Sequence, residues 1–283
     1  MVTNFVMFRR ITIIGLGLIG GSLALAIKEK NLAKELVGVS RRKSTINHAI
    51  RNRMVDVATL DLKKGVKDSD LVIISAPVFK IVDIAKQIAP FLKNGAILTD
   101  AGSTKKYIVR NIEPIIPKGV YFVGSHPFAG SEKSGIKSSD RDLFNGAFCI
   151  VTKTLNTNPE VLSKIKRFWE KLKMKVAVMG LNEHDKMVSK LSHLPHTAAV
   201  SLVNSIGSMK AKFASSGFRD ATRIASGEPE LWKDIFLTNR DNLIKDIEIL
   251  KRELSKIEMA LKNNDKVELL KSLNRAKFIR DSL

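Results

Sequence analysis

The chain has 283 residues, 44% of them hydrophobic, which is enough for one large globular domain or two ordinary ones. Its 48 Lys and Arg against 28 Asp and Glu give a net charge of +20, yet both signs are spread along the chain without an RNA-binding motif. This distribution favours a basic surface that attracts anionic substrates over a nucleic-acid-binding protein. With a single cysteine, no apolar run of the ~20 residues that span a bilayer and no signal-peptide pattern, we expect a cytoplasmic protein without disulfide or membrane contact.

The first predicted elements are a strand and a helix joined by a glycine-rich turn. Residues 10–23 read RITIIGLGLIGGSL, a β-branched run that leads into Gly-x-Gly-x-x-Gly and then an apolar helix over residues 18–30. Gly15 permits a tight turn, Gly17 lets a pyrophosphate approach the backbone, and Gly20 lets helix and strand pack closely. A glycine turn in another kind of α/β protein is the alternative. We predict that the phosphates of a dinucleotide bind at the helix N-terminus, against Gly15, Leu16, Gly17, Leu18, Ile19 and Gly20.

A second strand, residues 35–40, ends where dinucleotide-binding sheets contact the adenosine ribose. An Asp or Glu at this place accepts a hydrogen bond from the 2′-hydroxyl of NAD. This chain instead has Ser40, Arg41 and Arg42, with no acid in reach. A hydroxyl followed by two guanidinium groups suits a 2′-phosphate, which Arg binds in a bidentate fashion. We therefore predict NADP in preference to NAD; an exposed basic loop that stacks on adenine is the alternative.

Further strands follow at the spacing of alternating strands and helices. They are predicted over residues 70–75, 96–100, 120–124, 146–151 and 175–179, with a helix over 159–173. The loops after the strands bring small or polar residues to one edge of the sheet. Among them, Ser75, Ala76 and Pro77 would pass beside the cofactor, and Ser103 lies in the turn at residues 101–105. Residues 1–180 are therefore predicted to form a doubly wound parallel sheet of the Rossmann type.

Residues 181–283 show no further strand pattern and are predicted to form an all-helical domain. Between residues 242 and 261 apolar side chains alternate by four and three, which is the spacing of a heptad seam: Leu243, Ile247, Leu250, Leu254, Ile257 and Leu261. Such a seam packs either within the chain or against a second copy, and the pattern itself favours neither. We expect a homodimer that is joined through the helical domain.

Candidate catalytic residues gather in the stretch at residues 125–135, SHPFAGSEKSG, which follows a strand end at the ligand-binding edge. His126 is the best candidate for a general base because imidazole titrates near neutral pH. A histidine that only satisfies loop backbone is the alternative.

The helical region holds further polar candidates. Asp220 and Arg223 are three residues apart and share a helix face, either in an anion site or as a surface ion pair. Four other residues are of types that bind zinc, but their spacing in the sequence is not that of a zinc site, so no metal is expected. They are His184, Asp185, His193 and His196.

These segments resemble the prephenate dehydrogenase family, the tyrosine-pathway enzymes that act on prephenate or arogenate. The resemblance rests above all on GSHPFAGSEKSG at residues 124–135, and also on residues 15–22, 100–105, 192–196 and 217–225. It covers the chain from residue 10 to about residue 281. It implies a Rossmann domain, a helical dimerisation domain and an active site in the cleft between them. The implied reaction removes hydride from C4 of the substrate ring and expels the ring carboxylate as carbon dioxide, which makes the ring aromatic.

The resemblance also implies roles for single residues. His126 matches the histidine that takes the proton of the ring 4-hydroxyl, and Ser103 matches a serine near that hydroxyl and the nicotinamide. Arg223 matches the arginine that binds a substrate carboxylate. His196 is implied to point toward substrate, whereas His193 is implied to hold its helix to the nucleotide-binding domain. Four further residues match positions that line or gate the pocket: Glu132, Asp185, Asp220 and Trp232.

Two other functions stay open on sequence grounds. One is a two-domain dehydrogenase of β-hydroxyacids, although the glycine-flanked catalytic lysine of that group is not evident in this chain. The other is a non-catalytic protein that binds NAD or NADP. Within the resemblance itself the preferred substrate also stays open, because prephenate and arogenate differ only in a keto or an amino group on the side chain.

Overall fold

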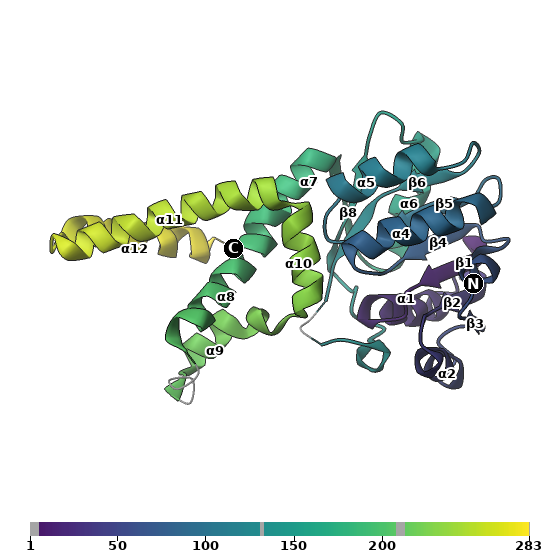
Figure 1. Ribbon diagram of the computed structural model, residues 1–283, viewed down its shortest axis with the longest axis horizontal. Coiled ribbons are helices and arrows are strands. Elements are labelled where there is room, and N and C mark those ends of the chain that lie inside the picture. The colour runs from purple at the N-terminus through teal and green to yellow at the C-terminus, as the bar shows by residue number, and fades with distance from the viewer. Residues whose placement is uncertain (1–5, 131–132, 208–212, 283) are drawn as a thin grey trace. The chain divides into compact units, whose positions relative to one another are not determined.

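The computed structural model describes residues 6–130, 133–207 and 213–282, and its ribbon is shown in Figure 1. Six parallel strands form a sheet in the order β3-β2-β1-β4-β5-β6. They are β1 (Phe8–Ile14), β2 (Ala33–Val39), β3 (Val57–Thr59), β4 (Leu71–Ile74), β5 (Ile97–Asp100) and β6 (Tyr121–Val123). The strand order reverses between β1 and β4, and in such sheets ligands bind at the carboxyl ends of the strands beside this point. The doubly wound sheet predicted from the sequence is therefore confirmed, with β3 as a short additional strand.

Helices cover both faces of this sheet, which explains why its central strands are apolar throughout. In β4, Leu71 and Ile73 pack into one hydrophobic cluster, and Val72 and Ile74 pack into the other. The first cluster includes side chains of α1 (Leu18–Glu29), α2 (Lys43–Arg51) and α6 (Pro159–Lys171). The second includes side chains of α3 (Leu62–Val66), α4 (Val78–Ile88) and α5 (Lys106–Ile112).

The strands that follow β6 leave the main sheet and form a second one, which the sequence did not predict. This sheet has the order β7-β8-β9, with β7 (Ser125–Phe128) antiparallel to β8 (Phe148–Lys153) and β8 parallel to β9 (Lys175–Gly180). Residues 125–128 were expected in a loop and instead begin this sheet. Pro127 is tolerated because β7 lies at the edge, where a missing backbone N–H removes no ladder hydrogen bond.

The chain after β9 is helical, as predicted. Its first part comprises α7 (Leu181–Val188), a π-helical turn at Ser189–His193, α8 (Leu194–Ile206), α9 (Ser216–Thr222), a 3₁₀ turn at Arg223–Ser226 and α10 (Pro229–Thr238). Helix α7 contacts α5 and β8, and α10 contacts α4, adding Ile235 to the second cluster of the sheet. No helix in the described part of the chain has the length and apolar character that a bilayer crossing requires.

The chain divides into two compact units, residues 1–239 and residues 240–283. The second unit is a pair of adjacent helices, α11 (Arg240–Lys262) and α12 (Lys266–Asp281) (Figure 1). In the predicted heptad seam on α11, Leu243 is buried, whereas Leu254 and Leu261 are 58% and 63% exposed. The domain boundary at residue 180 differs from this division and stays a prediction.

Candidate active site

The glycine-rich turn after β1 has the geometry of a phosphate-binding site. Gly15 has a φ of +96°, and a Cβ there would lie 2.0 Å from the carbonyl oxygen of Ser75. A Cβ on Gly20 would lie 1.9 Å from the carbonyl oxygen of Gly15, so helix and turn pack backbone to backbone. At Gly17, by contrast, a Cβ would meet no described atom within 4 Å. The backbone is therefore tightly packed at Gly15 and Gly20, whereas the space next to the Cα of Gly17 is open.

The N-terminus of α1 presents unpaired N–H groups beside this open space. Among the described residues, no side chain caps this helix, and its first turn carries no acid. A helix start of this kind attracts anions through its N–H groups and its dipole. The turn and the start of α1 fit the phosphates of a dinucleotide.

Two other strands of the sheet end at the same edge. Ser75 follows β4, and its N–H donates to the carbonyl oxygen of Ile14 at 2.7 Å. At the end of β2, Arg41 and Arg42 are exposed, and the N–H of Arg42 donates to Ser40 Oγ at 3.4 Å.

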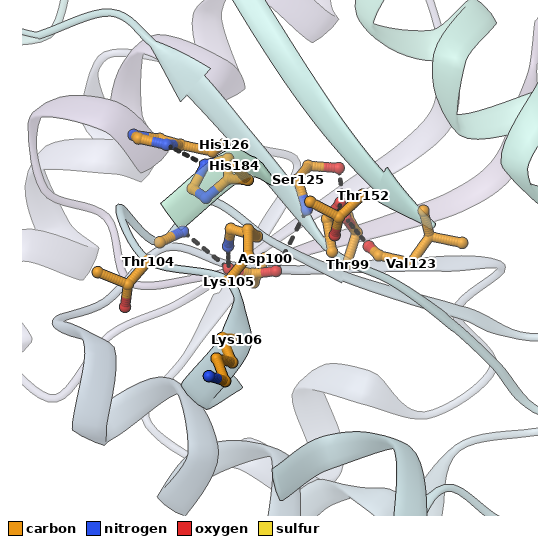
Figure 2. Close-up of polar contacts among 12 residues, drawn as sticks. Thr99, Asp100, Thr104, Lys105, Lys106, Val123, Ser125, His126, Thr152 and His184 are labelled. Atoms are coloured by element: carbon orange, nitrogen blue, oxygen red, sulfur yellow. Dashed lines mark hydrogen bonds and ion pairs between the residues drawn. The ribbon is translucent and has the colours of Figure 1, made fainter. Parts of the chain in front are cut away.

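Asp100, the last residue of β5, organises the turn that carries Ser103. Its Oδ2 accepts the N–H of Gly102 at 2.8 Å and pairs with Lys105 Nζ, and both side chains of the ion pair are fully buried (Figure 2). Its Oδ1 accepts the N–H of Ser125 at 3.3 Å. Asp100 therefore connects two segments, the turn with Ser103 and the start of β7, which carries His126.

Ser125 fixes the start of β7 from the side of the protein core. Its Oγ accepts the indole N–H of Trp169 at 3.0 Å and lies 2.9 Å from Thr99 Oγ1. Trp169 is fully buried on α6. The next residue along the strand is His126, whose ring packs against that of Phe128 with centroids 4.3 Å apart. Buried hydrogen bonds thus hold Ser125, the residue directly before the catalytic candidate.

Two side chains of α7, His184 and Asp185, support His126 through a chain of hydrogen bonds. His126 Nδ1 lies 2.9 Å from His184 Nε2, and His184 Nδ1 lies 2.7 Å from Asp185 Oδ1 (Figure 2 shows the two histidines). An ionised carboxylate only accepts hydrogen bonds, so Asp185 requires a proton on Nδ1 of His184. A neutral His184 then offers its Nε2 lone pair, and His126 donates Nδ1–H to it. This tautomer leaves His126 Nε2 without a proton, as a general base requires.

Asp185 is held in its ionised form by the start of α5. Its two oxygens accept the backbone N–H groups of Lys105 and Lys106 at 2.8 and 3.0 Å. Burial by itself raises the pKa of Asp185, but the hydrogen bonds from His184 and from these two amides lower the pKa below its ordinary value of 3.8. The carboxylate also stands at a helix N-terminus, where negative charge is stabilised.

His126 is held in its neutral form. Burial lowers the pKa of His126 well below its ordinary value of 6.5, and the neighbouring His184 and the Lys105 ammonium lower it further. Burial also lowers the pKa of His184, although the hydrogen bond to Asp185 acts in the opposite direction. At neutral pH the pair is therefore uncharged, and His126 is ready to accept a proton.

The helices after β9 place a second group of predicted residues together. His196 stacks on Trp232 with ring centroids 3.5 Å apart and planes 12° apart, and burial lowers the pKa of His196 to about 4. Its Nδ1 is buried without a hydrogen-bond partner among the described residues. The ring of His193 accepts a hydrogen bond from the Asn239 amide at 3.2 Å, at the end of α10. Its expected role of holding its helix to the nucleotide-binding domain stays a prediction.

The remaining predicted site residues are Asp220, Arg223 and Glu132. Helix α9 ends at Thr222, so Arg223 opens a 3₁₀ turn and does not continue the helix of Asp220. Both Asp220 and Arg223 are exposed. Glu132 lies outside the described residues. In the part of the chain that is described, no three His, Cys, Asp or Glu side chains gather in a way that could hold a metal ion.

Sequence reasoning did not link His184 to His126. The two are 58 positions apart, and His184 entered only through a zinc hypothesis. The available signal was an adjacent His-Asp pair at the start of a helix, directly after a strand that ends at the same edge of the molecule as His126. Read together with the polar stretch at residues 125–135, that pair pointed to an oriented base.

The chain matches known proteins over nearly its whole length. The model of the prephenate dehydrogenase nucleotide-binding domain matches residues 23–178, and that of the prephenate dehydrogenase dimerization domain matches residues 181–275. Prephenate dehydrogenase of Bacillus subtilis is 34% identical over 280 residues, which cover 96% of this chain and 76% of that protein. Cyclohexadienyl dehydrogenase of Zymomonas mobilis is 30% identical over 283 residues, with 98% and 96% covered. The crystal structure of prephenate dehydrogenase from A. aeolicus in complex with hydroxyphenyl propionate and NAD+ has a TM-score of 0.90 at 32% identity, covering 97% of this chain and 98% of that one.

Proposed function

The chain belongs to the prephenate dehydrogenase family, and we propose that it catalyses the NADP-dependent oxidative decarboxylation of prephenate. The observation that carries this proposal is the hydrogen-bond chain from Asp185 through His184 to His126. It supports a neutral imidazole whose Nε2 is available to accept a proton. A reaction that turns a ring hydroxyl into a carbonyl needs such a group beside the reacting carbon.

His126 takes the proton in this mechanism. The 4-hydroxyl of prephenate gives its proton to His126 Nε2 while hydride leaves C4. The positive charge that arises on His126 is stabilised through His184 by the carboxylate of Asp185, which stays ionised. The ring carboxylate then departs as carbon dioxide, its bonding electrons complete the aromatic ring, and the resulting phenolate oxygen takes the proton back from His126 to form the phenolic hydroxyl. Aromatisation makes the reaction strongly downhill, so the protein's main tasks are orientation and proton acceptance.

A nicotinamide cofactor supplies the acceptor for the hydride. The residues that would hold its pyrophosphate are the turn from Gly15 to Gly20 and the first N–H groups of α1, which fit because the space above Gly17 is open. Ser40, Arg41 and Arg42 would hold the ribose 2′-phosphate of NADP, since a hydroxyl and two guanidinium groups complement its charge and shape. Ser75, Ala76 and Pro77 would line the cofactor along the carboxyl edge of the sheet.

Other residues orient the substrate. We assign Ser103, on the turn held by Asp100, to the neighbourhood of the reacting hydroxyl. Arg223 binds a substrate carboxylate, with Asp220 and Glu132 as further polar residues of the pocket. The stacked pair of His196 and Trp232 provides an aromatic wall, and the buried, unpaired Nδ1 of His196 marks a polar position on that wall.

A homodimer formed through the helical region completes the proposal. The family model that matches residues 181–275 is described as a dimerization domain. On α11 and α12 several apolar side chains are more than half exposed, among them Ile244, Leu254, Leu270 and Phe278. Apolar surface of this extent on a two-helix unit favours burial against a second copy. Light scattering at micromolar concentration should give twice the mass of one chain; a monomeric mass overturns this part of the proposal.

A four-way assay tests the proposed function. The purified chain is mixed with prephenate or arogenate and with NAD or NADP, and cofactor reduction is followed near 340 nm. We expect reduction with prephenate and a higher kcat/KM with NADP than with NAD. Ser40→Asp should reverse the cofactor preference, because a carboxylate repels the 2′-phosphate and accepts from a 2′-hydroxyl. Reduction with arogenate alone, or no reduction with either substrate, overturns the substrate assignment, and equal use of NAD by the unmodified chain overturns the cofactor assignment.

A further inference from the structure

After β7, the chain returns to helix α1. It forms a 3₁₀ turn at Ile136–Ser138, and Ile136 is buried in the same hydrophobic cluster as Leu16 of the glycine-rich turn and Leu23 of α1. On the outgoing side, a Cβ at Gly130 would lie 3.9 Å from Ile19 Cδ1. Both described ends of the segment therefore lie along the N-terminal half of α1.

Ser22 holds the returning backbone by a buried hydrogen bond. Its side chain is fully buried on α1, and its Oγ accepts the N–H of Asp140 at 2.9 Å. A hydroxyl in the middle of an apolar helix is an unusual choice, because serine lowers helix stability relative to alanine. The hydrogen bond to Asp140 gives this serine a role that the helix itself does not require.

Gly21 lets the same segment approach the helix closely. A Cβ on Gly21 would lie 2.0 Å from Ser139 Oγ, 3.1 Å from Ser139 Cβ and 3.3 Å from Ile136 Cγ1, so a larger residue requires the Ser139 hydroxyl to turn away and both residues to shift from the helix. This contact differs from that of Gly20, whose Cβ would meet the glycine-rich turn. Gly21 and Ser22, which directly follow the glycine-rich turn, thus contact residues 139 and 140 and not the turn itself.

We propose that Gly21 and Ser22 are positioning residues that hold residues 136–140 on α1 and thereby place residues 133–140 for substrate binding. The kinetic part of this proposal rests on the proposed function. His126 itself is oriented from its other side, by Ser125 and His184. Displacing the segment should therefore weaken substrate binding more than it lowers turnover.

A compensating pair of substitutions tests the contact. Gly21→Ala should raise the KM for prephenate about tenfold with a smaller loss in kcat, because overpacking displaces the segment. Ser139→Gly removes the two nearest atoms that the new methyl group meets and leaves only Ile136 Cγ1 at 3.3 Å, so the double variant Gly21→Ala/Ser139→Gly should return to within about threefold of the unmodified KM. Gly65→Ala is the matched control, since Gly65 lies on another helix, α3, and its Cβ would meet Cγ2 of Val39 in β2 at 2.3 Å. Ser139→Gly should not rescue it, and equal rescue of both variants, or of neither, overturns the proposal.

Backbone hydrogen exchange gives a readout that does not depend on catalysis. Ser22→Ala should increase exchange at the Asp140 amide by about three- to tenfold, because that amide loses its hydrogen-bond acceptor. The free energy of global unfolding should change little, because the loss is local. Gly21→Ala should increase exchange at the same amide, and Ser139→Gly should restore its protection. Protection at Asp140 that is unchanged in Ser22→Ala and Gly21→Ala overturns the proposal. Absent prephenate oxidation by the unmodified chain would refute the proposed function, and the exchange result would still decide on the contact.

Discussion

Two aspartate–lysine ion pairs stand at opposite ends of neighbouring strands, and they differ in burial and in what they hold. Asp70 precedes β4 at its amino end and pairs with Lys93 at 2.5 Å, and the two side chains are 25% and 35% exposed. Asp100 ends β5 at its carboxyl end and pairs with Lys105, and both side chains are fully buried. The same chemistry thus occurs once in contact with water and once without it.

The two pairs also hold different parts of the chain. Asp70 Oδ2 accepts the N–H groups of Arg9 and Arg10 at 2.6 and 3.1 Å, so this pair joins the starts of two strands. Asp100 joins the turn of Ser103 to the strand of His126. An ion pair near the surface contributes about 0–1 kcal/mol, whereas a buried pair carries a desolvation penalty of several kcal/mol per ion. The molecule therefore keeps its more costly pair at the end of the sheet where we propose that the reacting groups lie.

The largest expected effect comes from removing the base at the carboxyl end. His126→Asn keeps a hydrogen-bonding side chain but accepts no proton at neutral pH, so kcat should fall by roughly 10²–10⁴-fold. His48→Asn, on the partly exposed surface of α2, is the matched control and should leave kcat unchanged. Near-normal turnover of His126→Asn from about pH 6 to 9 would exclude His126 as the base and direct attention to His196.

The next effect compares the two ion pairs directly. Asp100→Asn/Lys105→Met removes both buried charges together and leaves no uncompensated ion. It should lower kcat/KM by about 10–100-fold, because the turn of Ser103 and the start of β7 lose their shared anchor. The corresponding change at the amino end, Asp70→Asn/Lys93→Met, should alter kcat/KM by less than about threefold. Urea unfolding of each variant separates lost stability from lost geometry, and equal kinetic losses at both ends would contradict the comparison.

A smaller effect appears in the pH dependence of stability. Burial lowers the pKa of His193 to about 4 in the folded chain, whereas an unfolded histidine titrates near 6.5. Stability from the neutral ring is therefore complete above pH 6.5 and is lost as the pH falls toward 4. His193→Asn should flatten the fall in unfolding free energy across this window by about 1–2 kcal/mol. The Asp70 pair should not contribute there, because the pKa of Asp70 is lowered below 3.8 and its charge persists. An equally steep fall in His193→Asn would refute this assignment.

Local features of the site were predictable from the sequence. The start of α1 at Leu18 and the roles of Gly15 and Gly20 follow from spacing within a single strand, turn and helix, so no distant residue is needed to infer them. The apolar run of β4 likewise predicts a central strand, because burial on both faces imposes it. His126 was found because a titratable side chain stood in a polar stretch at the end of a predicted strand.

Other features depend on contacts between distant parts of the chain. Residues 125–128 form a strand only because β8 pairs with them, and the glycines and polar residues of the longer stretch 125–135 indicated a loop. The bonds from Asp185 to the start of α5 span 80 and 79 positions, and no spacing rule connects them. The end of α9 before Arg223 was also missed, because three-residue spacing indicates a shared helix face but not where a helix stops.

The central claim is that His126 is neutral at physiological pH, with its proton on Nδ1 and its Nε2 available as the base. The most direct measurement is ¹⁵N NMR of the imidazole nitrogens of His126, assigned by comparison with His126→Asn and followed as the pH is lowered. The account predicts a protonated Nδ1 and an unprotonated Nε2 at neutral pH, with no second protonation until the pH is well below 6.5. A doubly protonated ring at neutral pH, or a proton on Nε2, would contradict it.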